Sequence, residues 1–276
     1  MYEPYLHTLN YFMRYLSFRF AVSTCAFILM LFTYAVTFAG APAKNYYQLK
    51  IYHYKSQSQE DKIEHYLQQA YVPAMHRAGI KNVGVFKPVT QQDTNRMIYV
   101  FTPFTSFESL VGSANKIQED TKYLADGKEY IDADYKEAPY TRLETIILQA
   151  FPGMPSTAVP NLTANKTDRV YELRSYESAT EKYNINKVKM FNTGDEINIF
   201  KTLGFNAVFY GEVIAGSHMP NLMYMTTFNS KEDRDKHWDA FGSAPAWKAL
   251  TAQAQYANNV SHADIIFLHP VVYSDF

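Results

Sequence analysis

The feature of this sequence that most constrains its fold is an internal repeat. The segment Tyr47–Tyr52 (YQLKIY) returns in the second half of the chain as Tyr171–Tyr176 (YELRSY). Both copies are followed by patterns typical of a helix, two strands, a second helix and a final strand. The repeat therefore predicts a tandem duplication of one small α+β unit.

The N-terminal segment has to be separated from this repeat. Residues 20–43 carry no charged side chain, follow Arg14 and Arg19, and end in the small residues AGAPA. This pattern predicts a signal peptide at residues 1–43 and an exported protein, periplasmic or secreted after cleavage. The uncharged stretch is also long enough to span a bilayer, so an uncleaved membrane anchor is the alternative.

The composition excludes several classes of function. The single cysteine, Cys25, lies within the predicted signal peptide, so we expect neither a disulfide nor a thiolate nucleophile in the mature chain. The formal net charge of the whole sequence is only -1. This balance provides no electrostatic reason to bind nucleic acid or an anionic membrane surface.

A proline-rich segment divides the two copies. The run PGMPSTAVP at 152–160 is too rich in proline for a helix or a central strand and is typical of a linker. We therefore expect a first unit at 44–151, a linker at 152–167 and a second unit at 168–276.

Three segments of the second copy resemble bacterial members of the NIPSNAP family: 187–192 (KVKMFN), 203–216 (LGFNAVFYGEVIAG) and 219–225 (MPNLMYM). Trp238, Phe241, Pro245 and Trp247 agree with the same pattern. The resemblance covers residues 168–250 well and residues 46–150 loosely. It implies ferredoxin-like units of the dimeric α-β barrel type, here in tandem within one chain, and it is not tied to one reaction.

Several predicted strands are apolar at consecutive positions, among them Val208–Tyr210, Leu222–Met225 and Ile265–Leu268. A half-solvated antiparallel strand would alternate with polar residues, so both faces of each sheet must be covered. The helices of a ferredoxin-like unit cover one face, which leaves the other face for the second unit. We therefore predict antiparallel sheets packed face to face around a barrel-like interior that can hold a ligand.

Polar side chains recur at matching positions of the first strand in each unit. Glu172, Arg174 and Tyr176 share one face, and Gln48, Lys50 and Tyr52 are their equivalents. We expect this face to point into the space between the sheets, where Arg174, Tyr176, Lys50 and Tyr52 would orient an anionic or carbonyl-bearing molecule. A self-satisfied Arg–Glu pair near a strand end is the commoner arrangement and stays the alternative.

The next hairpin supplies further candidates for the cavity. Tyr210 and Glu212 share a face of one strand, Tyr224 lies on its partner, and His218 lies in the loop between them. A histidine close to a tyrosine and a carboxylate can transfer protons near neutral pH. The alternative for His218 is an exposed loop residue without a chemical role.

No motif for a metal or a cofactor is present. The histidines outside the signal peptide show none of the close pair spacings of zinc helices, and the sequence lacks a phosphate loop, a dinucleotide-binding turn and a serine elbow. We therefore expect no metal and no cofactor. Haem is held by a single histidine in other dimeric α-β barrels. Haem binding therefore stays an alternative here, based only on the analogy between folds.

Two functions from different classes remain. The first is small-molecule binding in the cavity between the sheets, with or without cofactor-independent catalysis, and it requires a cavity with convergent polar groups. The second is a noncatalytic protein-interaction or scaffolding module, which requires a filled interior and an exposed apolar patch. Assembly into a homo-oligomer is compatible with both.

Overall fold

The structure is a computed structural model that describes residues 13–14 and 44–276. Apart from Met13 and Arg14, the predicted signal peptide lies outside the described residues. Within the described part of the chain, no helix combines the length and the apolarity needed to cross a membrane.

Each half of the described chain contributes four antiparallel strands. The elements of the first half are β1 (Tyr46–Tyr54), α2 (Gln57–His65), a π-helical turn η1 (Tyr66–Tyr71), α3 (Val72–Arg77), β2 (Gly84–Pro88), β3 (Arg96–Phe104), α4 (Phe107–Gln118), α5 (Thr121–Asp126), α6 (Lys128–Ile131) and β4 (Arg142–Ala150). Those of the second half are β5 (Val170–Glu177), α7 (Glu181–Asn192), α8 (Glu196–Thr202), β6 (Asn206–Ala215), β7 (Asn221–Phe228), α9 (Lys231–Ser243), α10 (Pro245–Thr251), a 3₁₀ turn η2 (Ala254–Tyr256) and β8 (His262–Pro270).

The eight strands form one closed barrel in the order β1-β3-β2-β8-β5-β7-β6-β4. Numbered within its own half, each set of four strands has the same spatial order, 4-1-3-2. The halves join where β2 pairs with β8 and where β4 pairs with β6. The sheets do face each other, as predicted, but not as two separate layers: pairing at both junctions satisfies edge N–H and C=O groups that two open sheets would leave exposed.

Side chains from both halves fill most of the barrel. The rings of Phe101 and Phe209 stack at 4.7 Å between centroids, and Tyr47 lies 5.2 Å from Phe209. Phe86 and Tyr171 form a similar contact across the β2–β8 junction, at 4.9 Å. The interior is therefore a shared hydrophobic core that belongs to neither half alone.

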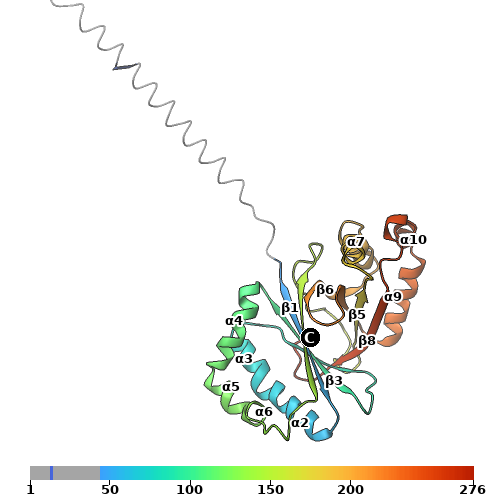
Figure 1. Cartoon of the computed structure of the whole chain (residues 1–276). Helices are drawn as coiled ribbons and strands as arrows, with labels where there is room; N and C mark the ends of the chain where they lie inside the picture. The colour runs from blue at the N-terminus through green and yellow to red at the C-terminus, as the bar shows by residue number, and fades with distance from the viewer. Residues whose placement is uncertain (1–12, 15–43) are drawn as a thin grey trace, which may run out of the picture. The chain divides into compact units, whose positions relative to one another are not determined.

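Helices cover the outer face of the barrel. Figure 1 shows α2 to α6 beside the strands of the first half, and α7, α9 and α10 beside those of the second. Each group packs on its own strands through a separate hydrophobic cluster, one for each half. The prediction that both faces of the sheets are covered is confirmed.

Serine side chains cap the start of α4 and of α9. The Ser106 hydroxyl accepts a hydrogen bond from the Ser109 amide at the start of α4, and Ser230 accepts one from Asp233 at the start of α9. The segment between β4 and β5 has no helix or strand, but it is not detached, because the Ala158 amide donates to the carbonyl of Val208 in β6.

Candidate functional site

A cavity of about 260 Å³ opens at one end of the barrel interior. Six strands meet there: β1 and β5 contribute their C-terminal ends, and β3, β4, β7 and β8 their N-terminal ends. The loop between β6 and β7 completes the wall. The lining residues are Ile51, His53, Met97, Tyr99, Glu144, Ile146, Leu173, Ser175, Ser217, His218, Asn221, Met223, Asp264 and Ile266.

Glu144 is held in this wall from both halves of the chain. Its Oε1 lies 2.8 Å from His53 Nε2, and its Oε2 accepts a hydrogen bond from the Ser217 hydroxyl at 3.2 Å. The other ring nitrogen of His53, Nδ1, lies 2.9 Å from Asn95 Oδ1. Both nitrogens of His53 therefore have protein partners, and the ring orients Glu144 rather than presenting a free nitrogen to the cavity.

Two polar groups of the wall lack a strong partner. Asn221 is 1% exposed, and its amide nitrogen donates to Ser175 Oγ, but its Oδ1 has no hydrogen-bond partner. The Tyr99 hydroxyl donates only to the sulfur of Met97, at 3.4 Å. Burial, reinforced by the charges of Glu144 and Asp264, raises the pKa of Tyr99, so this hydroxyl stays protonated and able to donate. Unpaired buried polar groups are uncommon and suggest that a ligand completes them.

The charge of the cavity is the reverse of what the sequence suggested. Glu144 and Asp264 line it, together with two histidines, and none of its lining residues is a lysine or an arginine. The prediction that Arg174 and Lys50 orient an anionic or carbonyl-bearing molecule in the interior was wrong, because both lie on the outer, helix-covered face of the sheet. Arg174 stacks on Trp238 of α9, and Lys50 lies over the ring of Tyr71.

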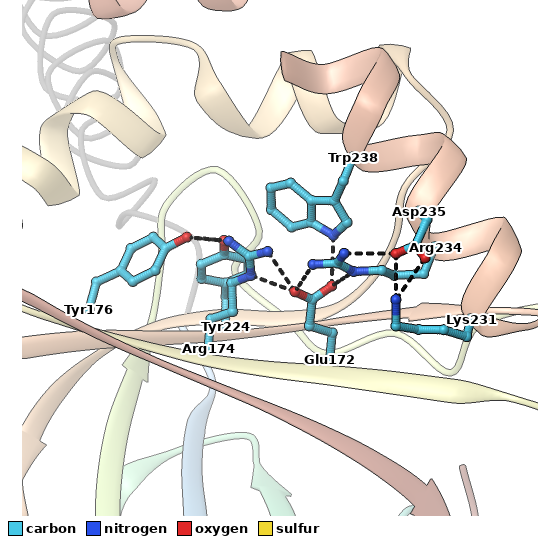
Figure 2. A network of polar contacts seen from close by, with 8 residues as sticks. All are labelled: Glu172, Arg174, Tyr176, Tyr224, Lys231, Arg234, Asp235 and Trp238. Atoms are coloured by element: carbon cyan, nitrogen blue, oxygen red, sulfur yellow. Dashed lines mark hydrogen bonds and ion pairs between the residues drawn. The ribbon is translucent and has the colours of Figure 1, made fainter. Parts of the chain in front are cut away.

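The predicted polar triplet forms a buried network between β5 and α9 (Figure 2). Glu172 is fully buried, and its two oxygens accept hydrogen bonds from Arg174, Arg234 and the indole N–H of Trp238 at 2.6–2.9 Å. Arg174 also donates to the Tyr176 hydroxyl, which lies 2.8 Å from that of Tyr224. The triplet is thus the self-satisfied alternative, and it fastens α9 to the sheet.

Most of the other residues predicted for the cavity also lie on the helix side of the sheet. Tyr210 is buried in the helix-side cluster of the second half, and Tyr52 in that of the first. Glu212 accepts a hydrogen bond from Asn184 of α7, and burial raises the pKa of its carboxyl group. His218 alone among the predicted residues lines the cavity. The expectation that the others point into the interior was wrong. The apolar faces of β1 and β5 turn inward, and Tyr210, Glu212 and Tyr224 contact the helix side of the sheet.

Sequence reasoning missed His53, Tyr99, Glu144, Asn221 and Asp264. The available signal was the alternation itself: Ile51 and His53 share a face with Tyr47 and Leu49, the apolar side of β1. Had that side been assigned to the interior, the polar residues at its end would have marked the cavity.

A larger groove of about 750 Å³ lies along β8 and the start of α9, and it shares Met97 and Ile266 with the smaller cavity. Three of its polar groups already have partners: Ser230 caps α9, Lys231 pairs with Asp235, and His269 Nδ1 lies 2.7 Å from the carbonyl of Arg169. We place the candidate site in the smaller cavity, where the buried Asn221 Oδ1 has no partner.

The network around Glu172 makes stability depend on pH in a defined direction. Burial alone would raise the pKa of Glu172, but hydrogen bonds and charge from Arg234 and Arg174 outweigh it and hold the pKa below the ordinary 4.5. The resulting stability is present above the unfolded-state pKa and is lost as pH falls through the lower folded-state pKa. Urea unfolding of the wild type and Glu172→Gln should therefore differ less at pH 3 than at pH 7, and a constant difference would contradict this account.

The comparisons with known proteins agree with this architecture. The sequence model of the NIPSNAP family matches residues 171–275. No curated protein sequence shows significant similarity to the chain. A candidate monooxygenase of Fusobacterium nucleatum superposes with a TM-score of 0.53 and 10% identity, over 83% of this chain and 93% of its own. A second candidate monooxygenase, from Lactobacillus acidophilus, superposes with a TM-score of 0.50 and 13% identity, over 82% of this chain and 94% of its own.

A NIPSNAP family protein of Agrobacterium tumefaciens aligns over 98% of its own length and 42% of this chain, with 17% identity and a TM-score of 0.35. At such identities, the two longer superpositions show a shared fold and no shared chemistry. The family match includes most of the region singled out by the resemblance in the sequence. Residues 171–275, in the second half of the chain, carry the match to the NIPSNAP family.

Proposed function

We propose that the protein binds a small molecule in the barrel-end cavity, and that this molecule carries hydrogen-bond donors or a positive charge. The observation that carries the proposal is the buried Asn221 Oδ1, an acceptor without a partner in the cavity wall. Glu144 and Asp264, whose side chains are 26% and 47% exposed, add two carboxylates to the same wall, where a cation or a hydrogen-bond donor would find acceptors.

Size and apolar contacts narrow the ligand further. A volume of about 260 Å³ equals roughly eight or nine water molecules at about 30 Å³ each, below the usual range for drug-sized ligands. Ile51, Ile146, Leu173 and Met223 supply apolar walls. These features favour a compact amine with an apolar body. The scaffolding alternative required a filled interior, and the cavity favours binding.

We also propose that the chain arose by tandem duplication and that it is exported. The matching strand order of the two halves and the YQLKIY/YELRSY repeat support a tandem duplication of one ferredoxin-like unit. The uncharged segment at 20–43 supports export through a signal peptide, with binding outside the cytoplasm.

Benzylamine and benzoate test the proposed ligand class, because they share an apolar ring and differ in the sign of their charge. Calorimetric titration should show benzylamine binding at least about tenfold more tightly than benzoate. Glu144→Gln keeps the side-chain size but removes a charge, and it should weaken benzylamine binding by about tenfold.

Glu137→Gln, at a carboxylate that is 76% exposed, is the matched control and should leave binding unchanged. Preference for benzoate, or equal binding of benzylamine by the wild type and Glu144→Gln, would contradict the proposal.

A further inference from the structure

A group of metal-ligand side chains gathers at the rim of the same barrel end. Glu177 ends β5, and His262 and Asp264 begin β8. Each offers one nitrogen or oxygen atom, and these atoms all lie within 4.8 Å of one another. His218 joins the group from the β6–β7 loop, with its Nδ1 2.9 Å from Glu177 Oε1.

Strand register brings these residues together. Glu177 pairs with His262 across β5 and β8, and Ser175 pairs with Asp264 in the next row of the same face. Directly paired residues of antiparallel strands point their side chains to the same side. The positive φ angles of Gly216 (153°) and His218 (66°) turn the loop back over this rim. Spacing within one helix could not reveal the group, because its members come from segments far apart in the sequence.

A separate observation points to a ligand beside this group. Asn221 is the partner of Glu177 on the other side of β5, in the pairing with β7. It is 1% exposed, its Oδ1 has no partner, and it lines the cavity together with His218 and Asp264. An amide oxygen is a suitable ligand for a divalent ion or for a water molecule bound to one.

We propose that Glu177, His262 and Asp264, joined by His218, bind one divalent transition-metal ion at the mouth of the cavity. Imidazole nitrogens combined with carboxylate oxygens suit Zn²⁺, Co²⁺, Mn²⁺ or Fe²⁺ better than Ca²⁺ or Mg²⁺, which prefer oxygen ligands alone. Two carboxylates balance the charge of the ion. The His218–Glu177 and His262–Asp264 contacts, at 2.9 and 3.1 Å, give way to bonds with the metal.

The test uses the full-length protein without a histidine tag, stripped with a chelator and titrated with Co²⁺ and Zn²⁺. We expect one ion per chain, seen by calorimetry for Zn²⁺ and as visible absorption bands for Co²⁺. Asp264→Asn, which preserves shape, and His262→Ala should each weaken Zn²⁺ binding by at least about tenfold.

His76→Ala is the matched control, because His76 pairs with Asp275 at 2.8 Å outside this group and its loss should leave binding unchanged. Absence of stoichiometric binding, or equal binding by the wild type and a folded Asp264→Asn variant, would overturn the proposal. The titration contains no organic ligand, so its failure would leave the binding of a small molecule in the cavity standing.

Discussion

Glu172→Gln is expected to lower the free energy of unfolding by about 3–5 kcal/mol at pH 7. The substitution preserves the size of the side chain but removes the charge that Arg174 and Arg234 share. Arg174 has only 10% of its side chain exposed, so its charge would remain in a poorly hydrated site without a counterion. Removing one partner of a buried ion pair costs more than the pair contributes, because the abandoned charge stays desolvated.

Chemical unfolding followed by circular dichroism measures this loss. Glu129→Gln, at an exposed glutamate of α6, is the matched control and should change stability by less than about 0.5 kcal/mol. A loss for Glu172→Gln as small as that of the control would show that solvent reaches the arginines. The contacts between β5 and α9 in Figure 2 would then contribute little to stability.

Phe209→Ala is expected to cost about 3–5 kcal/mol and to destabilise both halves of the chain together. Phe209 belongs to β6 in the second half, is fully buried, and stacks on Phe101 of β3 in the first half. Truncation removes apolar contacts and leaves a hole that a close-packed barrel cannot collapse to fill. Because this core is shared, the variant should still unfold in one transition at a lower denaturant concentration.

The same urea titration, read by tyrosine fluorescence and by circular dichroism, checks both parts of the expectation. Val111→Ala is the control, since Val111 is 53% exposed on α4 and its truncation creates no cavity. Two separated transitions in the wild type, or a loss confined to one half, would contradict a barrel that closes around a common interior.

The sequence predicted much of the secondary structure, because the signals are local. The YQLKIY/YELRSY repeat marked the first strand of each half, and consecutive apolar residues such as Val208–Tyr210 required cover on both faces. The prolines of 152–160 marked a segment without a helix or strand. These inferences rest on backbone preference and side-chain periodicity, which neighbouring residues alone determine.

Local sequence patterns did not determine which face of each strand lines the barrel interior. Alternation separates Glu172 and Arg174 from Leu173 in any sheet, but it does not say which side a helix covers. In the structure α9 brings Arg234 and Trp238 to Glu172, and that pairing makes burial of the charges on the helix side tolerable. The barrel interior therefore contains apolar side chains and, at one end, a few polar residues.

The sequence by itself determined a mixed α/β fold with antiparallel strands that are covered on both faces, because the periodicity of apolar side chains can be read from neighbouring residues. Only the tertiary structure decided that the sheets join edge to edge into one barrel, and that His53, Glu144, Asn221 and Asp264 meet at its mouth. The physical reason is that strand pairing and register act between segments distant in the chain, and the gain in hydrogen bonds and buried area appears only when all eight strands are in place.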